Sequence, residues 1–94
     1  MYLILCKWLE DGEITAIDRQ QTIKLTDANI GYRADFVITR PDGTKEAVEF
    51  KGLVTEVFAL KKRLYKVYGP YKLLIYKKRG KQIYLDETII PRNV

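Results

Sequence analysis

The chain has 94 residues, of which 47% are hydrophobic and 31% are charged, as in one small globular domain. It contains no histidine, which excludes His-ligated zinc sites and Ser-His triads. A single cysteine excludes an internal disulfide, and no apolar run is long enough to span a membrane. We therefore expect one intracellular domain over residues 1–94, with no membrane segment and no small organic cofactor.

Basic residues are concentrated in the second half of the chain. Residues 1–50 carry 6 basic and 9 acidic side chains, whereas residues 51–94 carry 11 basic and 3 acidic ones. A block with this excess of positive charge favours a polyanionic partner such as nucleic acid. A solvated, lysine-rich surface is the alternative interpretation.

The first predicted element covers residues 2–10, where apolar residues fall at helical spacing. The same stretch is rich in β-formers, so a strand remains the alternative. Asp11 and Gly12 end the element in either case. Residues 21–26 alternate like a strand, and residues 27–31 are expected to form a loop.

A β-hairpin is the clearest local signal in the sequence. Residues 32–39 and 44–51 both alternate between apolar and polar side chains, and Pro41-Asp42-Gly43 separates them. Proline presets φ and glycine supplies a left-handed position, so the three residues predict a tight turn.

The register of this hairpin follows if Arg40 faces Thr44. The predicted pairs are Phe36–Val48, Ala34–Phe50, Ile38–Glu46, Val37–Ala47 and Asp35–Glu49. The pairs of Phe36 and Ala34 would form one apolar face. On the other face, Asp35 would lie opposite Glu49 with their Cβ atoms about 5 Å apart.

A helix is predicted from Thr55, a good N-cap residue, to Gly69. Its expected apolar stripe consists of Val57, Leu60, Leu64, Val67 and Tyr68. Strands are expected over residues 71–77 and 82–85, and the tail from Asp86 is left unassigned. The order predicts an α/β (α+β) fold, with a mixed sheet of about four to five strands, a central hairpin and one or two helices.

Two acids and a lysine should converge on one face of the hairpin. Lys51 follows Glu49 by two residues and therefore points to the same side of the strand as Glu49. Two carboxylates this close repel each other unless a positive charge lies between them, and hard divalent cations prefer such oxygens. A cation held by Asp35 and Glu49, with a lysine beside it, suits phosphodiester hydrolysis. The alternative is an ordinary polar sheet surface.

These residues resemble the signature of the PD-(D/E)xK nuclease superfamily, in which an Asp is followed by a Glu-x-Lys strand. The chain is similar to a family of small phage-encoded proteins of that superfamily, over about residues 8–78. The matching segments are Gly12-Glu13-Ile14, Gln20-Gln21, Tyr32–Phe36, Glu49–Gly52, Thr55 and Leu60–Leu64.

The resemblance implies a restriction-endonuclease-like fold and a metal-dependent DNA endonuclease, resolvase-like or restriction-like. Asp35, Glu49 and the carbonyl of Phe50 would bind Mg²⁺ or Mn²⁺, and Lys51 would assist the attacking water. Many relatives carry an additional Glu on the helix before the first strand. Here the acids of that region are Glu10, Asp11 and Glu13, at the end of the helix. A second metal site, and activity itself, therefore stay open.

Several other residues are candidates for substrate contacts. The predicted phosphate contacts are Arg33, Lys61, Lys62, Arg63 and Lys66. A solvated helix face is the alternative for the lysines. Gln21 and Thr55 are candidate orienting groups.

We therefore expect a Mg²⁺-dependent endonuclease that acts on DNA, as a homodimer whose two sites cut both strands. It would act in the cytoplasm, which would be that of the host cell if the protein is encoded by a virus or phage. The first alternative is a nucleic-acid-binding module that cuts no bond. The second is a degenerate nuclease fold that serves as an interaction protein.

Overall fold

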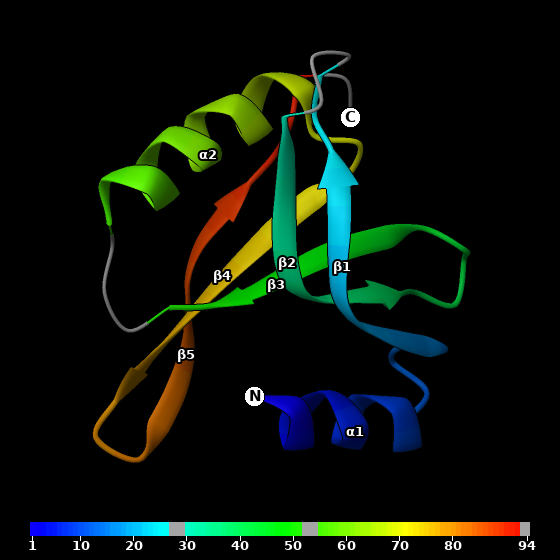
Figure 1. The fold of residues 1–94 in the computed structure, drawn as a ribbon. Helices are drawn as coiled ribbons and strands as arrows, with labels where there is room; N and C mark the ends of the chain where they lie inside the picture. The colour runs from blue at the N-terminus through cyan, green and yellow to red at the C-terminus, as the bar shows by residue number, and fades with distance from the viewer. Residues whose placement is uncertain (27–29, 52–54, 93–94) are drawn as a thin grey trace.

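The computed structural model describes residues 1–26, 30–51 and 55–92, which form a five-stranded mixed sheet with two helices (Figure 1). The elements are α1 (Tyr2–Glu10), β1 (Ala16–Lys24), β2 (Gly31–Thr39), β3 (Lys45–Phe50), α2 (Glu56–Tyr68), β4 (Lys72–Arg79) and β5 (Gln82–Ile89). The strands lie in the sheet in sequence order. The predicted α+β fold with a mixed sheet is thus confirmed.

α1 settles the ambiguity of residues 2–10 in favour of a helix. Leu5 is completely buried, and Trp8 packs at the margin of the same core. In Figure 1, α1 lies below the strands and α2 lies at the upper left, beside the upper ends of the strands. Neither of these helices, in the segments that the structure describes, is long and apolar enough to cross a membrane.

The hairpin of β2 and β3 has the predicted turn and, from Phe36 to Thr39, the predicted register. The N–H of Arg40 donates to the carbonyl of Thr44 at 2.8 Å, and Gly43 adopts a φ of +91°. The observed pairs include Phe36–Val48, Val37–Ala47 and Ile38–Glu46. Turn chemistry and alternation therefore suffice to fix this part of the sheet.

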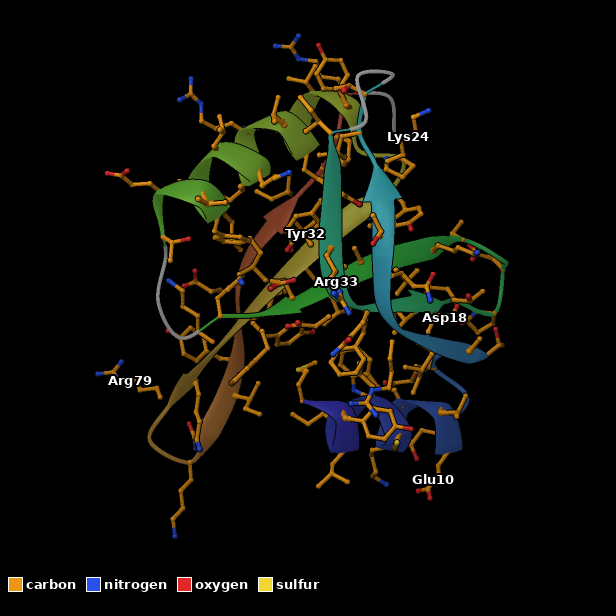
Figure 2. All side chains as sticks on the ribbon, in the orientation of Figure 1. Glu10, Asp18, Lys24, Tyr32, Arg33 and Arg79 are labelled. Carbon is orange, nitrogen blue, oxygen red and sulfur yellow. The ribbon has the colours of Figure 1, made fainter. Side chains whose placement is uncertain are left out.

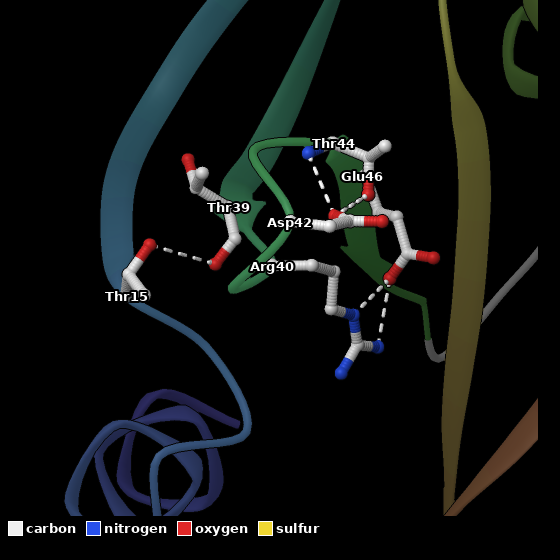
Figure 3. A network of polar contacts seen from close by, with 6 residues as sticks. All are labelled: Thr15, Thr39, Arg40, Asp42, Thr44 and Glu46. Carbon is white, nitrogen blue, oxygen red and sulfur yellow. Dashed lines mark hydrogen bonds and ion pairs between the residues drawn. The ribbon is translucent and has the colours of Figure 1, made fainter.

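Side chains reinforce the turn, as Figure 3 shows. The Asp42 carboxylate accepts hydrogen bonds from the hydroxyl of Thr44 at 2.7 Å and from its N–H at 2.9 Å. These bonds hold the pKa of Asp42 below its usual value. Arg40 and Glu46 form an ion pair at 2.7 Å just beyond the turn.

The remaining strands differ from the prediction mainly in length. β1 begins at Ala16, five residues before the predicted start, and β5 continues to Ile89 through the tail that was left unassigned. β3 and β4 are parallel, with α2 in the crossover between them, and β4 and β5 are antiparallel. Of the predicted loop at 27–31, residues 27–29 lie outside the described residues, and Gly31 already belongs to β2.

Two buried clusters lie against the sheet, one with each helix. The α2 cluster contains Ile23, Leu25, Tyr32, Ala34, Val37, Ala47, Phe58, Tyr65, Leu73, Ile75 and Ile89. The α1 cluster contains Leu5, Ile14, Phe36, Ile38, Val48 and Leu74. Apolar residues therefore pack against both faces of the central strands β2, β3 and β4.

β1 and β2 bend together (Figure 1), and the bend changes which face their side chains meet. Gln20 has a φ of +50°, and the paired residues on either side of it are Arg19–Phe36 and Gln21–Ala34. Ala34 belongs to the α2 cluster, whereas Phe36 belongs to the α1 cluster. The prediction that Ala34 and Phe36 share an apolar face is therefore wrong, because strict alternation does not survive the bend.

The buried face of α2 also differs from the prediction. Phe58 and Tyr65 are buried, whereas Val57 and Leu60 of the predicted stripe are 67% and 55% exposed. The helix places its two large rings on the sheet, because aromatic side chains bury the most apolar area. The predicted stripe is therefore wrong for Val57, Leu60 and Tyr68, whereas Leu64 packs at the margin of the α2 cluster and Val67 is half-buried.

Candidate active site

The candidate site lies where β2 and β3 diverge. The described ladder between these strands ends at Phe36–Val48, and β3 continues alongside β4 as far as Phe50–Tyr76. The predicted ladder pairs Asp35–Glu49 and Ala34–Phe50 are therefore wrong. The bend at Asp35 turns β2 away from β3, so side chains take over the contacts there.

Asp35 and Glu49 each bond to the backbone of the opposite strand. The Asp35 Oδ2 atom accepts a hydrogen bond from the Phe50 N–H at 2.9 Å. The Glu49 Oε2 atom accepts one from the Asp35 N–H at 3.3 Å. These reciprocal bonds fix both carboxylates at the same point of the sheet.

Lys51 completes the predicted group of three. Its Nζ atom lies 2.9 Å from Oε1 of Glu49 and 5.0 Å from the centroid of the Phe58 ring on α2. Glu49 is only 2% exposed, so its charge would be costly without this partner. The two acids and the amine thus lie together, as predicted, although through the divergence of the strands rather than through ladder pairing.

Tyr32 adds a buried hydroxyl that the sequence interpretation did not assign to the site. The side chain is 5% exposed, and within the described residues its hydroxyl makes no well-formed hydrogen bond, although it lies close to the Glu49 carboxylate. Burial raises the pKa of this phenol, and its interaction with the Glu49 carboxylate and the nearby charge of Asp35 raise it further. The hydroxyl is therefore a neutral donor close to the Glu49 carboxylate, with the charge of Asp35 nearby.

Sequence alternation placed Tyr32 on the face of β2 opposite to Asp35, which is why it was not assigned to the site. In a regular strand, residues three apart lie on opposite faces, so alternation separates Tyr32 from Asp35. The bend in β2 removes that separation. Figure 2 shows Tyr32 at the centre of the molecule, between α2 and the strands.

The donor set suits a hard cation with few protein ligands. No group of three or more His, Cys, Asp or Glu residues in the described ranges could hold a metal ion. Mg²⁺, however, commonly takes only one or two carboxylates, with waters and substrate phosphates as the remaining ligands. Asp35 and Glu49, with the carbonyl of Phe50 between Glu49 and Lys51 in sequence, fit that pattern.

The acids near the end of α1 do not join this group as the structure describes it. Glu10 is exposed and points away from the strands, below α1 in Figure 2. Asp11 is the C-cap residue of α1, and it forms an exposed ion pair with Lys7 at 3.4 Å. Glu13 is also exposed.

The four predicted phosphate contacts on α2 divide into two groups. Lys61 donates to the carbonyl of Gly31, and Lys62 forms an ion pair with Glu87 at 3.0 Å. These two lysines therefore tie α2 to the sheet. Arg63 and Lys66 are exposed on the same helix.

Three further candidates have local partners. Arg33 is exposed, and its Nη2 atom donates to Oε1 of Gln20 at 2.6 Å. Gln21 donates weakly to the carbonyl of Arg19, at 3.4 Å within its own strand. The Thr55 hydroxyl accepts from the Phe58 N–H at 3.1 Å, which confirms it as the N-cap of α2 and occupies it in that role.

Comparison with known proteins gives a family and a fold. The model of a family described as "Protein of unknown function (DUF1064)" matches residues 19–84. No curated protein matches the chain. The crystal structure of SSO0001 is similar, with a TM-score of 0.52 and 16% sequence identity, over 96% of this chain and 48% of that chain. The chain thus spans about half the length of that protein, and the likeness is one of fold.

Proposed function

Because the chain belongs to the DUF1064 family, whose function is unknown, we propose its function from the site itself: a metal-dependent endonuclease that hydrolyses DNA. The observation that carries the proposal is the contact between the buried Glu49 and Lys51 beside Asp35. Two carboxylates alone would suit a structural cation. The adjoining amine adds a group that can act on water or on a phosphate.

The residues fit Mg²⁺ or Mn²⁺ in a defined way. Asp35 and Glu49 would supply carboxylate oxygens, and Phe50 would supply its carbonyl. A bound divalent cation supplies Lewis acidity, which polarises a phosphoryl oxygen and lowers the pKa of a bound water. The backbone bonds to Asp35 and Glu49 hold both ligands in place before any cation arrives.

Lys51 is the group that acts on the reacting atoms. In hydrolysis, water adds to phosphorus, one P–O ester bond breaks, and the leaving alkoxide takes up a proton. The ammonium of Lys51 orients the attacking water and stabilises the negative charge that develops on the phosphoryl oxygens. The Phe58 ring fixes the direction of the lysine side chain.

Positive charge outside the site supports a nucleic-acid substrate. Residues 51–94 carry 11 basic and 3 acidic side chains, and Arg63 and Lys66 are exposed on α2. Exposed cations on one helix bind phosphates without regard to base sequence. The proposed reaction therefore combines a local hydrolytic site with general electrostatic attraction.

A nicking assay on supercoiled DNA tests the proposal. Wild-type protein with Mn²⁺ or Mg²⁺ should convert the supercoiled form to the open form, and Glu49→Gln should not. Glu46→Gln is the matched control, because Glu46 is also an ion-paired, largely buried acid on β3 but pairs with Arg40. If the wild type fails to cut linear, branched and single-stranded DNA, the proposal is wrong.

A further inference from the structure

A small cavity lies beside the candidate site and opens onto Asp35. Its volume is about 270 Å³, slightly below the range of roughly 300–1,000 Å³ that is typical of small-ligand sites. It is lined by Met1, Tyr2, Arg19, Gln20, Asp35, Phe36 and Phe50. The cavity thus shares Asp35 and Phe50 with the acid pair but adds residues that the proposed hydrolysis does not use.

The cavity wall is a stack of two rings and a guanidinium group. Tyr2 stacks on Phe36 with ring centroids 5.9 Å apart and an angle of 15° between the planes. The Arg19 guanidinium carbon lies 5.0 Å from the centroid of the Tyr2 ring. Both Tyr2 and Arg19 are exposed, although a tyrosine ring usually gains stability from burial. The stack can therefore be extended by a further flat group.

Gln20 contributes a polar edge to the same cavity. Its left-handed φ of +50° is unfavourable for a residue with a side chain, and such strain concentrates at functional sites. Oε1 accepts a hydrogen bond from Arg33, which leaves the two donors of the amide nitrogen for another partner. The cavity thus combines a stacking surface, a positive charge and hydrogen-bond donors.

We propose that this cavity receives one unstacked nucleotide of single-stranded DNA, adjacent to the phosphate that is cut. The proposal rests on the proposed endonuclease function and names its substrate class. Bases stack on aromatic rings and on arginine planes, and Arg19 would also meet the flanking phosphate. A paired base inside a duplex has no free face to offer. The protein should therefore prefer DNA with unpaired nucleotides.

The test is a binding measurement by fluorescence anisotropy in EDTA, where metal-dependent hydrolysis cannot occur. The probes are a labelled oligonucleotide of about 15 nucleotides, near the upper end of known single-strand site sizes, and its blunt duplex. Wild type should bind the single strand at least tenfold more tightly than the duplex. Arg19→Ala and Tyr2→Ala should each weaken single-strand binding about tenfold, the range of one lost base stack, and change duplex binding little.

Matched variants separate stacking from general effects. Tyr84 is 42% exposed on β5 and Arg79 is exposed at the end of β4, so Tyr84→Ala and Arg79→Ala are controls for lost ring and charge. Tyr2→Phe should keep the affinity, because stacking needs no hydroxyl. If Tyr2→Ala unfolds the protein, Arg19→Ala still tests the proposal, because Arg19 is exposed on β1. Equal binding of single strand and duplex, or wild-type affinity of Arg19→Ala, would overturn the inference.

The two proposals fail in distinguishable ways. If the wild type nicks DNA with Mn²⁺ but binds single strand and duplex equally, the cavity inference is wrong and the nuclease proposal stands. If single-strand binding depends on Arg19 and Tyr2 but no DNA is cut, the nuclease proposal is wrong. In that case the cavity belongs to a binding module.

Discussion

The carboxylate of Asp35 accepts the N–H of Phe50 at 2.9 Å, at the point where the ladder of β2 and β3 has ended. One side chain thus serves two purposes, because it joins the diverging strands and offers a negative charge beside Glu49. These purposes can be separated by substitution. An amide retains an oxygen acceptor for Phe50 but loses the charge.

Asp35→Asn should therefore abolish cleavage while leaving the fold largely intact. Asp35→Ala should abolish cleavage and also lower the free energy of unfolding by about 1.5–3 kcal/mol, since it removes a hydrogen bond to a charged acceptor. Urea unfolding of both variants, beside the plasmid-nicking assay, measures the two effects. Cleavage by Asp35→Asn at the wild-type rate would show that the carboxylate has no part in the reaction.

The buried pair of Glu49 and Lys51 allows a double-mutant cycle. Lys51→Met leaves the Glu49 charge buried without its partner, while methionine can still contact the Phe58 ring. We expect the free energy of unfolding to fall by about 1–3 kcal/mol, less than for a fully buried pair because the Lys51 side chain is 34% exposed. The double variant Lys51→Met with Glu49→Gln should recover most of that loss.

DNA cleavage should not follow stability through the same set of variants. All three variants should fail to cut DNA, whereas Lys51→Met should still bind it. Urea unfolding gives the coupling energy, and nicking with Mn²⁺ gives the activity. Restored cleavage in the stable double variant would mean that Glu49 and Lys51 only support the fold.

The sequence predicted the parts of the fold that depend on local chemistry. The hairpin followed from Pro41-Asp42-Gly43 and alternation, and its register placed Phe36 opposite Val48 as observed. The left-handed conformation of Gln20 has no such signal, because neither glycine nor asparagine marks it. The bend at that point moved Ala34 to the other face and brought Tyr32 toward the acids.

The buried face of α2 could not be predicted from the sequence for a different reason. Two sides of the helix carry apolar residues, one with Val57 and Leu60 and the other with Phe58 and Tyr65. Periodicity alone does not rank two such sides. The side with the rings packs on the sheet, and the Tyr65 hydroxyl donates a hydrogen bond to the carbonyl of Tyr71 at 2.7 Å. That contact depends on tertiary structure and leaves no pattern in the helix sequence.

Tyr32→Phe is a sensitive test of the site, because it deletes only the buried hydroxyl. That hydroxyl lies close to the Glu49 carboxylate but makes no well-formed hydrogen bond within the described residues, so its removal should change the free energy of unfolding by no more than about 1 kcal/mol. If the phenol donates to substrate or water at the acids, cleavage should fall about tenfold or more. Unfolding by urea and initial rates of nicking measure the two quantities.

Tyr65→Phe is the matched control for that experiment. Its hydroxyl is hydrogen-bonded to Tyr71, so the substitution should lower the free energy of unfolding by about 1 kcal/mol and leave cleavage unchanged. Equal cleavage rates in wild type and Tyr32→Phe would remove Tyr32 from the site. A large loss of stability in Tyr32→Phe would mean that the hydroxyl has a structural partner.

The basic residues of α2 should divide into anchors of the helix and contacts for DNA. Lys61 bonds to Gly31, so Lys61→Ala should lower the free energy of unfolding by about 1–2 kcal/mol. Arg63 and Lys66 are exposed, and replacing either with alanine should leave stability within about 0.5 kcal/mol of wild type. Each replacement should weaken DNA binding and reduce the slope of log affinity against log salt by about one. Anisotropy titrations over a range of salt concentrations measure that slope, and unchanged slopes in both variants would exclude Arg63 and Lys66 from the DNA interface.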